Sequence, residues 1–302
     1  MPDDEIRTPK AVTAFEDENH LPILTANPHV AMPVITPIAA AASLPEEISL
    51  ASLNQAQSLL ASLPDTLREQ AHSFTGATGI LGGLLFAKQS DIQAQQEKLL
   101  PSGALSTTQE LYQWLAAQPE HGARYRLVWF DLILPTLREA SAKERQQLLI
   151  LAKDLIRADG RISPTEFALY SLLRGALLPP YERLVKRREL RLEQLDKDIA
   201  DLLALLAYSG HEDVKAAEAA YREAIACSPV GTQRPLPAKS ELSLNKISEA
   251  LAHLALAAPP YRQKLLYACE VAVQHDGKIT PVENELLRAI KQNLNCPATA
   301  PN

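Results

Sequence analysis

The sequence predicts an all-α fold: a multi-helix array of antiparallel hairpins, with two similar hairpin units and a disordered N-terminal linker. After Ser43, apolar residues recur at spacings of three and four, the period of an amphipathic helix. Alternating apolar and polar residues, the pattern of a half-buried strand, are nearly absent from the sequence. Ser or Thr followed three residues later by an acid or amide marks repeated helix starts.

The first 43 residues contrast with this pattern. They are crowded with Pro, Thr, Ala and acidic residues and show no sustained helical or strand period. Such a segment has too little patterned apolar surface to offset the entropy of ordering it. We therefore expect residues 1–43 to form a Pro-rich flexible linker. The opening residues, MPDDEIRTPK, lack the charged start and apolar stretch of a signal peptide.

Two helical domains are expected after the linker, at residues 44–180 and 181–302. Helical periodicity marks residues 48–63, 108–117, 144–156, 191–207 and 261–273. A charged stretch at the start of the second domain carries a local basic cluster that could meet phosphate or an acidic partner. Acids interleaved with it favour a solvated helix face instead. The basic residues are Lys186, Arg187, Arg188 and Arg191.

Helix starts are predicted from capping boxes and prolines. In a capping box, a Ser or Thr side chain accepts from the N–H three residues on, and the acid or amide there accepts in return. Pro64 and Pro259 fit helix starts, where a missing N–H costs least. The expected capping pairs are Ser43 with Glu46, Ser106 with Gln109, Ser141 with Glu144, Ser163 with Glu166, and Thr280 with Glu283.

One helical hairpin occurs twice in the chain. Residues 145–177 align without gaps on residues 262–294, and both contain the pattern D-G-[RK]-I-[ST]-P-x-E. The first helix of each unit is expected to end at the Asp of this pattern. Gly160 and Gly277 are expected in the left-handed conformation that closes a helix C-terminus. Ile162 and Ile279 are expected to point back between the helices, which makes the whole motif a hairpin turn.

A cation site is the alternative interpretation of the same motif. Asp159 with Glu166, and Asp276 with Glu283, would supply the carboxylates. An EF-hand loop spreads its oxygen ligands over about twelve residues, whereas here Arg or Lys, Ile and Pro stand between the two acids. Each pair alone would be a weak site, so the hairpin turn is the preferred interpretation and no metal ligand is assigned firmly.

No catalytic motif stands out. The sequence carries no HExxH, GxSxG, Walker or GxGxxG pattern, and GILGG at residues 79–83 fits a small-residue face for close helix packing. Cys227, Cys269 and Cys296 are widely separated, which indicates a reducing compartment, and Cys269 is expected to be buried. A net charge of -6 gives no general attraction to nucleic acid or anionic lipid. The residues predict a non-catalytic helical module without a cofactor.

Three stretches, in this order, resemble the C-terminal extension of bacterial HtpX-like membrane zinc metallopeptidases. They are residues 60–88 (LASLPDTLREQAHSFTGATGILGGLLFAK), 129–173 and 251–298, and the similarity extends from about residue 44 to about residue 297. The two DG hairpins also resemble TerB-like helical domains, in which an acidic DG turn joins antiparallel helices. In the peptidase family, HExxH and a downstream Glu hold zinc in a separate domain, so no catalytic residue is carried over to this chain.

The resemblance implies a helical accessory or regulatory region of a membrane-associated zinc metallopeptidase. It would act through contacts with a protein partner or with its own protease domain, in the cytoplasm at the cytoplasmic face of the inner membrane. Zinc and the membrane segments would lie outside this chain, which would be either the tail of a longer peptidase or a separate protein. The TerB-like hairpins imply an alternative: a free-standing stress-response module that binds a divalent cation weakly. Its ligands would be Asp159, Glu166, Asp276 and Glu283.

Overall fold

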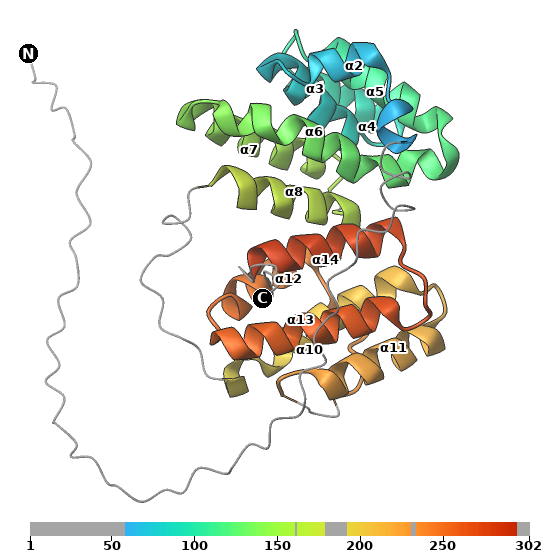
Figure 1. The fold of residues 1–302 in the computed structure, drawn as a ribbon, viewed down its shortest axis with the longest axis vertical. Coiled ribbons are helices and arrows are strands. Elements are labelled where there is room, and N and C mark those ends of the chain that lie inside the picture. Colours follow the sequence, from blue (N-terminus) through green and yellow to red (C-terminus); the bar gives the residue numbers. More distant parts are fainter. Residues whose placement is uncertain (1–57, 161, 179–191, 231–233, 295–302) are drawn as a thin grey trace, which may run out of the picture. The chain divides into compact units, whose positions relative to one another are not determined.

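A computed structural model of the chain describes residues 58–160, 162–178, 192–230 and 234–294 (Figure 1). Every regular element within these ranges is a helix, which confirms the predicted all-α fold class. Several predictions fall outside the described residues: the linker at 1–43, the capping pair Ser43 and Glu46, the helical pattern at 48–57, the basic cluster at 186–191, and the domain boundary at residue 180. The described residues all belong to one compact unit.

Short turns join the helices of the N-terminal half. Their bounds are α2 (Asp65–Gln70), α3 (Phe74–Leu84), α4 (Ser90–Leu99), α5 (Leu105–Ala117), the 3-10 helix η1 (Pro119–Tyr125), α6 (Arg126–Glu139), α7 (Ala142–Arg157) and α8 (Pro164–Leu177). The C-terminal half contains α10 (Leu192–Gly210), α11 (Val214–Cys227), the 3-10 helix η2 (Lys239–Glu241), α12 (Leu244–Leu254), α13 (Pro259–Gln274) and α14 (Pro281–Asn293). None of the helices in these described ranges is both long enough and apolar enough to cross a membrane.

Most of the predicted helix starts are confirmed. Pro64 directly precedes α2, and Pro259 is the first residue of α13. Pro fits both positions because the first turn of a helix leaves its N–H groups without intrahelical acceptors. Complete capping boxes, with hydrogen bonds in both directions, begin α7, α8 and α14 at Ser141, Ser163 and Thr280.

The capping box predicted at Ser106 is wrong. Helix α5 begins at Leu105, so Ser106 lies inside its first turn, and Gln109 Nε2 donates instead to Glu97 Oε1 of α4 at 2.7 Å. The residue before the helix, Ala104, already has near-helical backbone angles (φ -94°, ψ -19°). The preceding turn therefore leads straight into α5, without the extended residue that a capping side chain needs.

The glycines of GILGG allow α3 to lie close against α5. A Cβ atom at Gly79 would lie 2.6 Å from Cβ of Thr107, and one at Gly83 would lie 2.9 Å from Cβ of Leu111. Real side-chain atoms do not approach this closely, so larger residues would push the two helices apart. This contact confirms the small-residue face predicted from the sequence.

The hydrophobic core runs continuously through both halves of the described chain. Trp129 of α6 is fully buried, while the half-buried Trp114 of α5 meets it edge-on, with ring centroids 5.8 Å apart. Cys269 of α13 is also fully buried, and this burial raises the pKa of its thiol. Raising that pKa disfavours the reactive thiolate, as expected for a cysteine that serves as a small core residue.

The two copies of the repeated hairpin are α7–α8 and α13–α14, and their second helices, α8 and α14, pack directly against each other (Figure 1). Gly175 of α8 aligns with Gln292 of α14, and these equivalent positions meet. Gln292 Nε2 donates to the carbonyl oxygen of Leu172 at 3.1 Å, and a Cβ atom at Gly175 would lie 2.3 Å from that Nε2. The absence of a side chain at Gly175 in the first hairpin thus makes room for the side-chain amide of Gln292 in the second.

Candidate functional site

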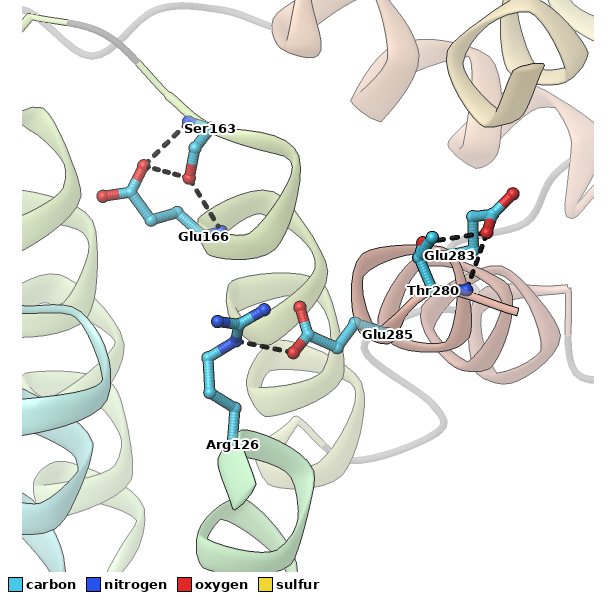
Figure 2. A network of polar contacts seen from close by, with 6 residues as sticks. All are labelled: Arg126, Ser163, Glu166, Thr280, Glu283 and Glu285. Atoms are coloured by element: carbon cyan, nitrogen blue, oxygen red, sulfur yellow. Dashed lines mark hydrogen bonds and ion pairs between the residues drawn. The ribbon is translucent and has the colours of Figure 1, made fainter. Parts of the chain in front are cut away.

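The first DG turn joins α7 to α8. Helix α7 ends at Arg157, two residues before the predicted end at Asp159, and Gly160 has φ +70°. The N–H of Gly160 donates to the Arg157 carbonyl at 3.0 Å. Ser163 then caps α8, and Glu166 Oε2 accepts from the Ser163 N–H at 2.7 Å and from its hydroxyl at 2.8 Å (Figure 2).

The second DG turn, between α13 and α14, repeats this geometry. Helix α13 ends at Gln274, again two residues before the predicted end at the Asp, and Gly277 has φ +74°. Glu283 Oε2 accepts from the Thr280 N–H and from its hydroxyl, each at 2.8 Å (Figure 2). The left-handed glycines and the capping roles predicted for the motif are therefore confirmed in both copies.

The isoleucine of the motif behaves differently in the two turns. Ile162 is partly buried and packs against the core, as predicted. Ile279 is 52% exposed, so the prediction that it points back between the helices is wrong. Ile162 lines a groove together with Leu244 of α12. A neighbouring helix, rather than the motif itself, therefore decides whether this residue is buried.

The four candidate cation ligands lie in unlike environments. Asp159 and Asp276 are exposed, and Asp276 Oδ1 accepts from the Lys278 N–H at 2.9 Å. Glu166 is half-buried, and burial raises its pKa; the charge of Asp159 adds to this effect, while the hydrogen bonds from Ser163 oppose it. The two acids of the first turn therefore interact electrostatically.

Glu283, the last of the four candidates, is 1% exposed and lies against the end of α10. A Cβ atom at Gly210 would lie only 1.9 Å from Glu283 Oε1. Residue 210 must therefore stay a glycine for this carboxylate to keep its place. No cluster of three or more His, Cys, Asp or Glu is placed to hold a metal ion in the described ranges. Cation binding at the two turns stays a prediction.

A buried ion pair links α14 to α6 beside these turns. Arg126 Nε donates to Glu285 Oε1 at 2.7 Å, and the two side chains are only 16% and 1% exposed (Figure 2). Burial raises the pKa of Glu285, and the Arg126 charge opposes this effect. A more exposed pair between the same helices joins Arg288 to both carboxylate oxygens of Asp131. Helix α14 is thus held against the N-terminal half by charge as well as by packing.

A groove of about 510 Å³ lies between the first repeated hairpin and α12. Its apolar floor includes Ile156 of α7, Phe167 of α8 and Leu251 of α12, which are 4%, 6% and 3% exposed. Ile162 of the first DG turn also lines it. The neutral polar side chains at its edge are Ser171, Asn245, Ser248 and Asn293.

Three exposed cations stand beside this floor. Lys153 and Arg157 lie one turn apart on α7, and Arg174 follows Tyr170 by one turn on α8. None of the ion pairs between described residues involves these three cations. The described residues that line the groove include no Asp or Glu. The groove therefore combines apolar depth with positive charge at its rim.

Sequence reasoning did not find this groove. The spacing of Lys153 and Arg157 was visible in the sequence, but the third cation and the apolar floor come from other elements. Helix α12 lies roughly 90 residues along the chain from α7. No local pattern identifies which distant helix will form the opposite wall. The basic cluster at 186–191, which the sequence did suggest, lies outside the described residues.

Comparisons with protein-family models, with curated proteins and with solved structures find no match to this chain.

Proposed function

We propose that this chain works through protein–protein contacts, as a non-catalytic accessory or regulatory region of a bacterial membrane zinc metallopeptidase of the HtpX-like kind. The observation that supports it is the groove between the first hairpin and α12. An apolar floor with a polar and charged rim is the usual form of a site that accepts a peptide segment of another protein. The floor residues belong to the continuous core, so the groove is preformed. A partner segment can therefore bind in it with little reorganisation of this chain.

The resemblance to the peptidase extension supplies the partner in this proposal. The groove would hold either the protease domain or a protein presented to it, at the cytoplasmic face of the inner membrane. Catalysis and zinc binding would remain with the protease domain. A change in the groove should therefore alter which proteins are cleaved, or how fast, without altering the chemistry of cleavage.

Photo-crosslinking in the source cells tests this function. A photoreactive residue at Asn245 or Ser248, both exposed in the groove, is compared with one at Lys143, which is exposed on α7 outside the groove. We expect crosslinks to a zinc metallopeptidase from the groove positions and not from residue 143. Crosslinks that form equally from residue 143, or that include no peptidase, would contradict the proposal.

An immunoblot of fractionated cells decides how the chain and the peptidase are connected. If the chain is the tail of the peptidase, an antibody against it detects a membrane-bound band well above 33.0 kDa. A soluble band at 33.0 kDa, together with the crosslink, indicates a separate protein that binds the peptidase. A soluble band without the crosslink favours a free-standing module.

Weak cation binding is a second candidate function, and the interaction between Asp159 and Glu166 favours it. A cation near both carboxylates would relieve their repulsion and stabilise the folded chain. We expect Ca²⁺ or Zn²⁺ to raise the melting temperature, and Asp159→Ala with Asp276→Ala to remove this rise. Asp154→Ala, at an exposed acid of α7, is the matched control. An equal rise in the double variant would exclude the two turns as the cation site.

A further inference from the structure

The charge of the groove restricts what can bind in it. Lys153, Arg157 and Arg174 carry three positive charges into a site whose described lining residues include no acid. A partner that brings carboxylates would gain from all three cations, whereas a basic partner would be repelled. Since the whole chain has a net charge of -6, this positive rim is a local exception and not part of a generally basic surface.

The floor of the groove requires an apolar side chain from the partner. Ile156, Phe167 and Leu251 are almost fully buried, yet they border an open volume of about 510 Å³. Side chains of Leu or Phe size could enter this volume and cover the floor residues further. The edge side chains of Asn245 and Ser248 can donate to the carbonyl groups of a bound backbone.

Other anionic ligands fit these features less well. A nucleic acid needs an extended basic surface along its backbone, and the acidic chain as a whole would repel it. A lipid surface binds apolar side chains that project outward, whereas these lie at the bottom of a groove. An amphipathic peptide can place apolar side chains in the groove and acids on its rim at the same time.

We propose that the groove binds an acidic amphipathic helix of a partner protein, with leucine-like side chains on the floor and carboxylates paired with Lys153, Arg157 and Arg174. This inference rests on the proposed function and adds the chemistry of the bound segment. The charge on α7 and α8 then selects the partner, since the apolar floor alone would accept any amphipathic helix.

Fluorescence anisotropy with the full chain tests the proposal. The probe is a labelled helical peptide of about 15 residues, with leucines at i, i+4 and i+7 and glutamates on both flanks. The control peptide has glutamine at every glutamate position. We expect the glutamate peptide to bind about tenfold more tightly than the glutamine peptide, and to weaken as salt concentration rises.

Two variants test the site itself. Arg157→Glu with Arg174→Glu should weaken binding of the acidic peptide about tenfold or more. The matched control, Lys143→Glu with Lys264→Glu, changes the net charge equally at exposed positions outside the groove and should bind as the unchanged chain does. Ser248→Trp keeps every charge but fills the groove, so it should also abolish binding. Circular dichroism verifies that each variant is folded.

Several outcomes would overturn the proposal. Equal binding of the two peptides, or unchanged binding by both groove variants, would show that the groove does not bind an acidic segment. Tighter binding of anionic vesicles or single-stranded DNA through the same arginines assigns the rim to another ligand. The crosslinks to a peptidase are measured independently, so the proposed function can survive these failures.

Discussion

At the scale of single residues, the two DG turns show how one motif can serve two different surroundings. Ser163 and Thr280 cap their helices with the same hydrogen bonds. Their glutamates differ, because Glu166 is half-buried whereas Glu283 is 1% exposed. A buried oxygen that loses its donor cannot regain one from water, so the same substitution should have unequal costs in the two turns.

The caps give a direct comparison between the two copies. Ser163→Ala should cost about 1 kcal/mol of unfolding free energy, the usual effect of losing an N-cap side chain. Thr280→Ala should cost about 1 kcal/mol more, because the buried Glu283, unlike Glu166, cannot replace the lost hydroxyl donor with water. Urea unfolding measures both losses. Thr280→Ser, which keeps the hydroxyl, is the control, and equal costs for the two alanine variants would contradict the expected role of burial.

At the scale of helices, periodicity and capping patterns predicted much of the fold, and contacts between distant elements supplied the rest. The starts of α7, α8 and α14 could be predicted because a capping box is local in sequence. The box at Ser106 failed because the turn ending at Ala104 made a cap unnecessary. The Arg126–Glu285 pair and the opposite wall of the groove could not be predicted, since their partners lie far apart in the chain.

The buried pair between α6 and α14 predicts a pH dependence. Burial raises the pKa of Glu285 in the folded state, so the folded chain retains a proton that the unfolded chain releases. The contribution of Glu285 to stability is therefore fully present below the ordinary carboxyl pKa of 4.5 and is lost as pH rises through the raised pKa. Glu285→Gln should flatten this decline. Urea unfolding at a series of pH values above the ordinary carboxyl pKa measures the free energy of unfolding of both chains.

The same comparison controls for other buried acids. Burial also raises the pKa values of Glu166 and Asp201, which remain in the variant and produce a decline of the same sign. The difference between the two pH profiles therefore reports Glu285 alone. The variant also leaves Arg126 without a carboxylate partner, which changes its overall stability but adds no titrating group and therefore no slope. Parallel profiles would show that Glu285 does not titrate differently on unfolding.

At the scale of the whole molecule, the repeated hairpins are joined rather than merely repeated. Helices α8 and α14 pack together, and the hydrophobic core extends across both halves of the described chain. The ion pairs of α14 with α6 add a second connection. Opening either half would therefore expose apolar surface belonging to the other.

We expect the helical body to unfold in one transition. Trp114 and Trp129 both lie in the N-terminal half, so tryptophan fluorescence reports that half, whereas circular dichroism reports helices in both. Coincident midpoints in urea are the expected result. A fluorescence transition separated from the circular dichroism transition would show that the halves unfold independently, as the two-domain division predicted from the sequence would allow.

The meeting of Gly175 with Gln292 has a consequence for how the two units differ. These positions correspond in the repeat, so two identical units would place the same residue against itself. Two glutamines would overlap, and two glycines would leave a void along the join. The packing of α8 against α14 therefore requires different residues at these two equivalent positions. Replacing either hairpin by a copy of the other would disrupt the contact between them.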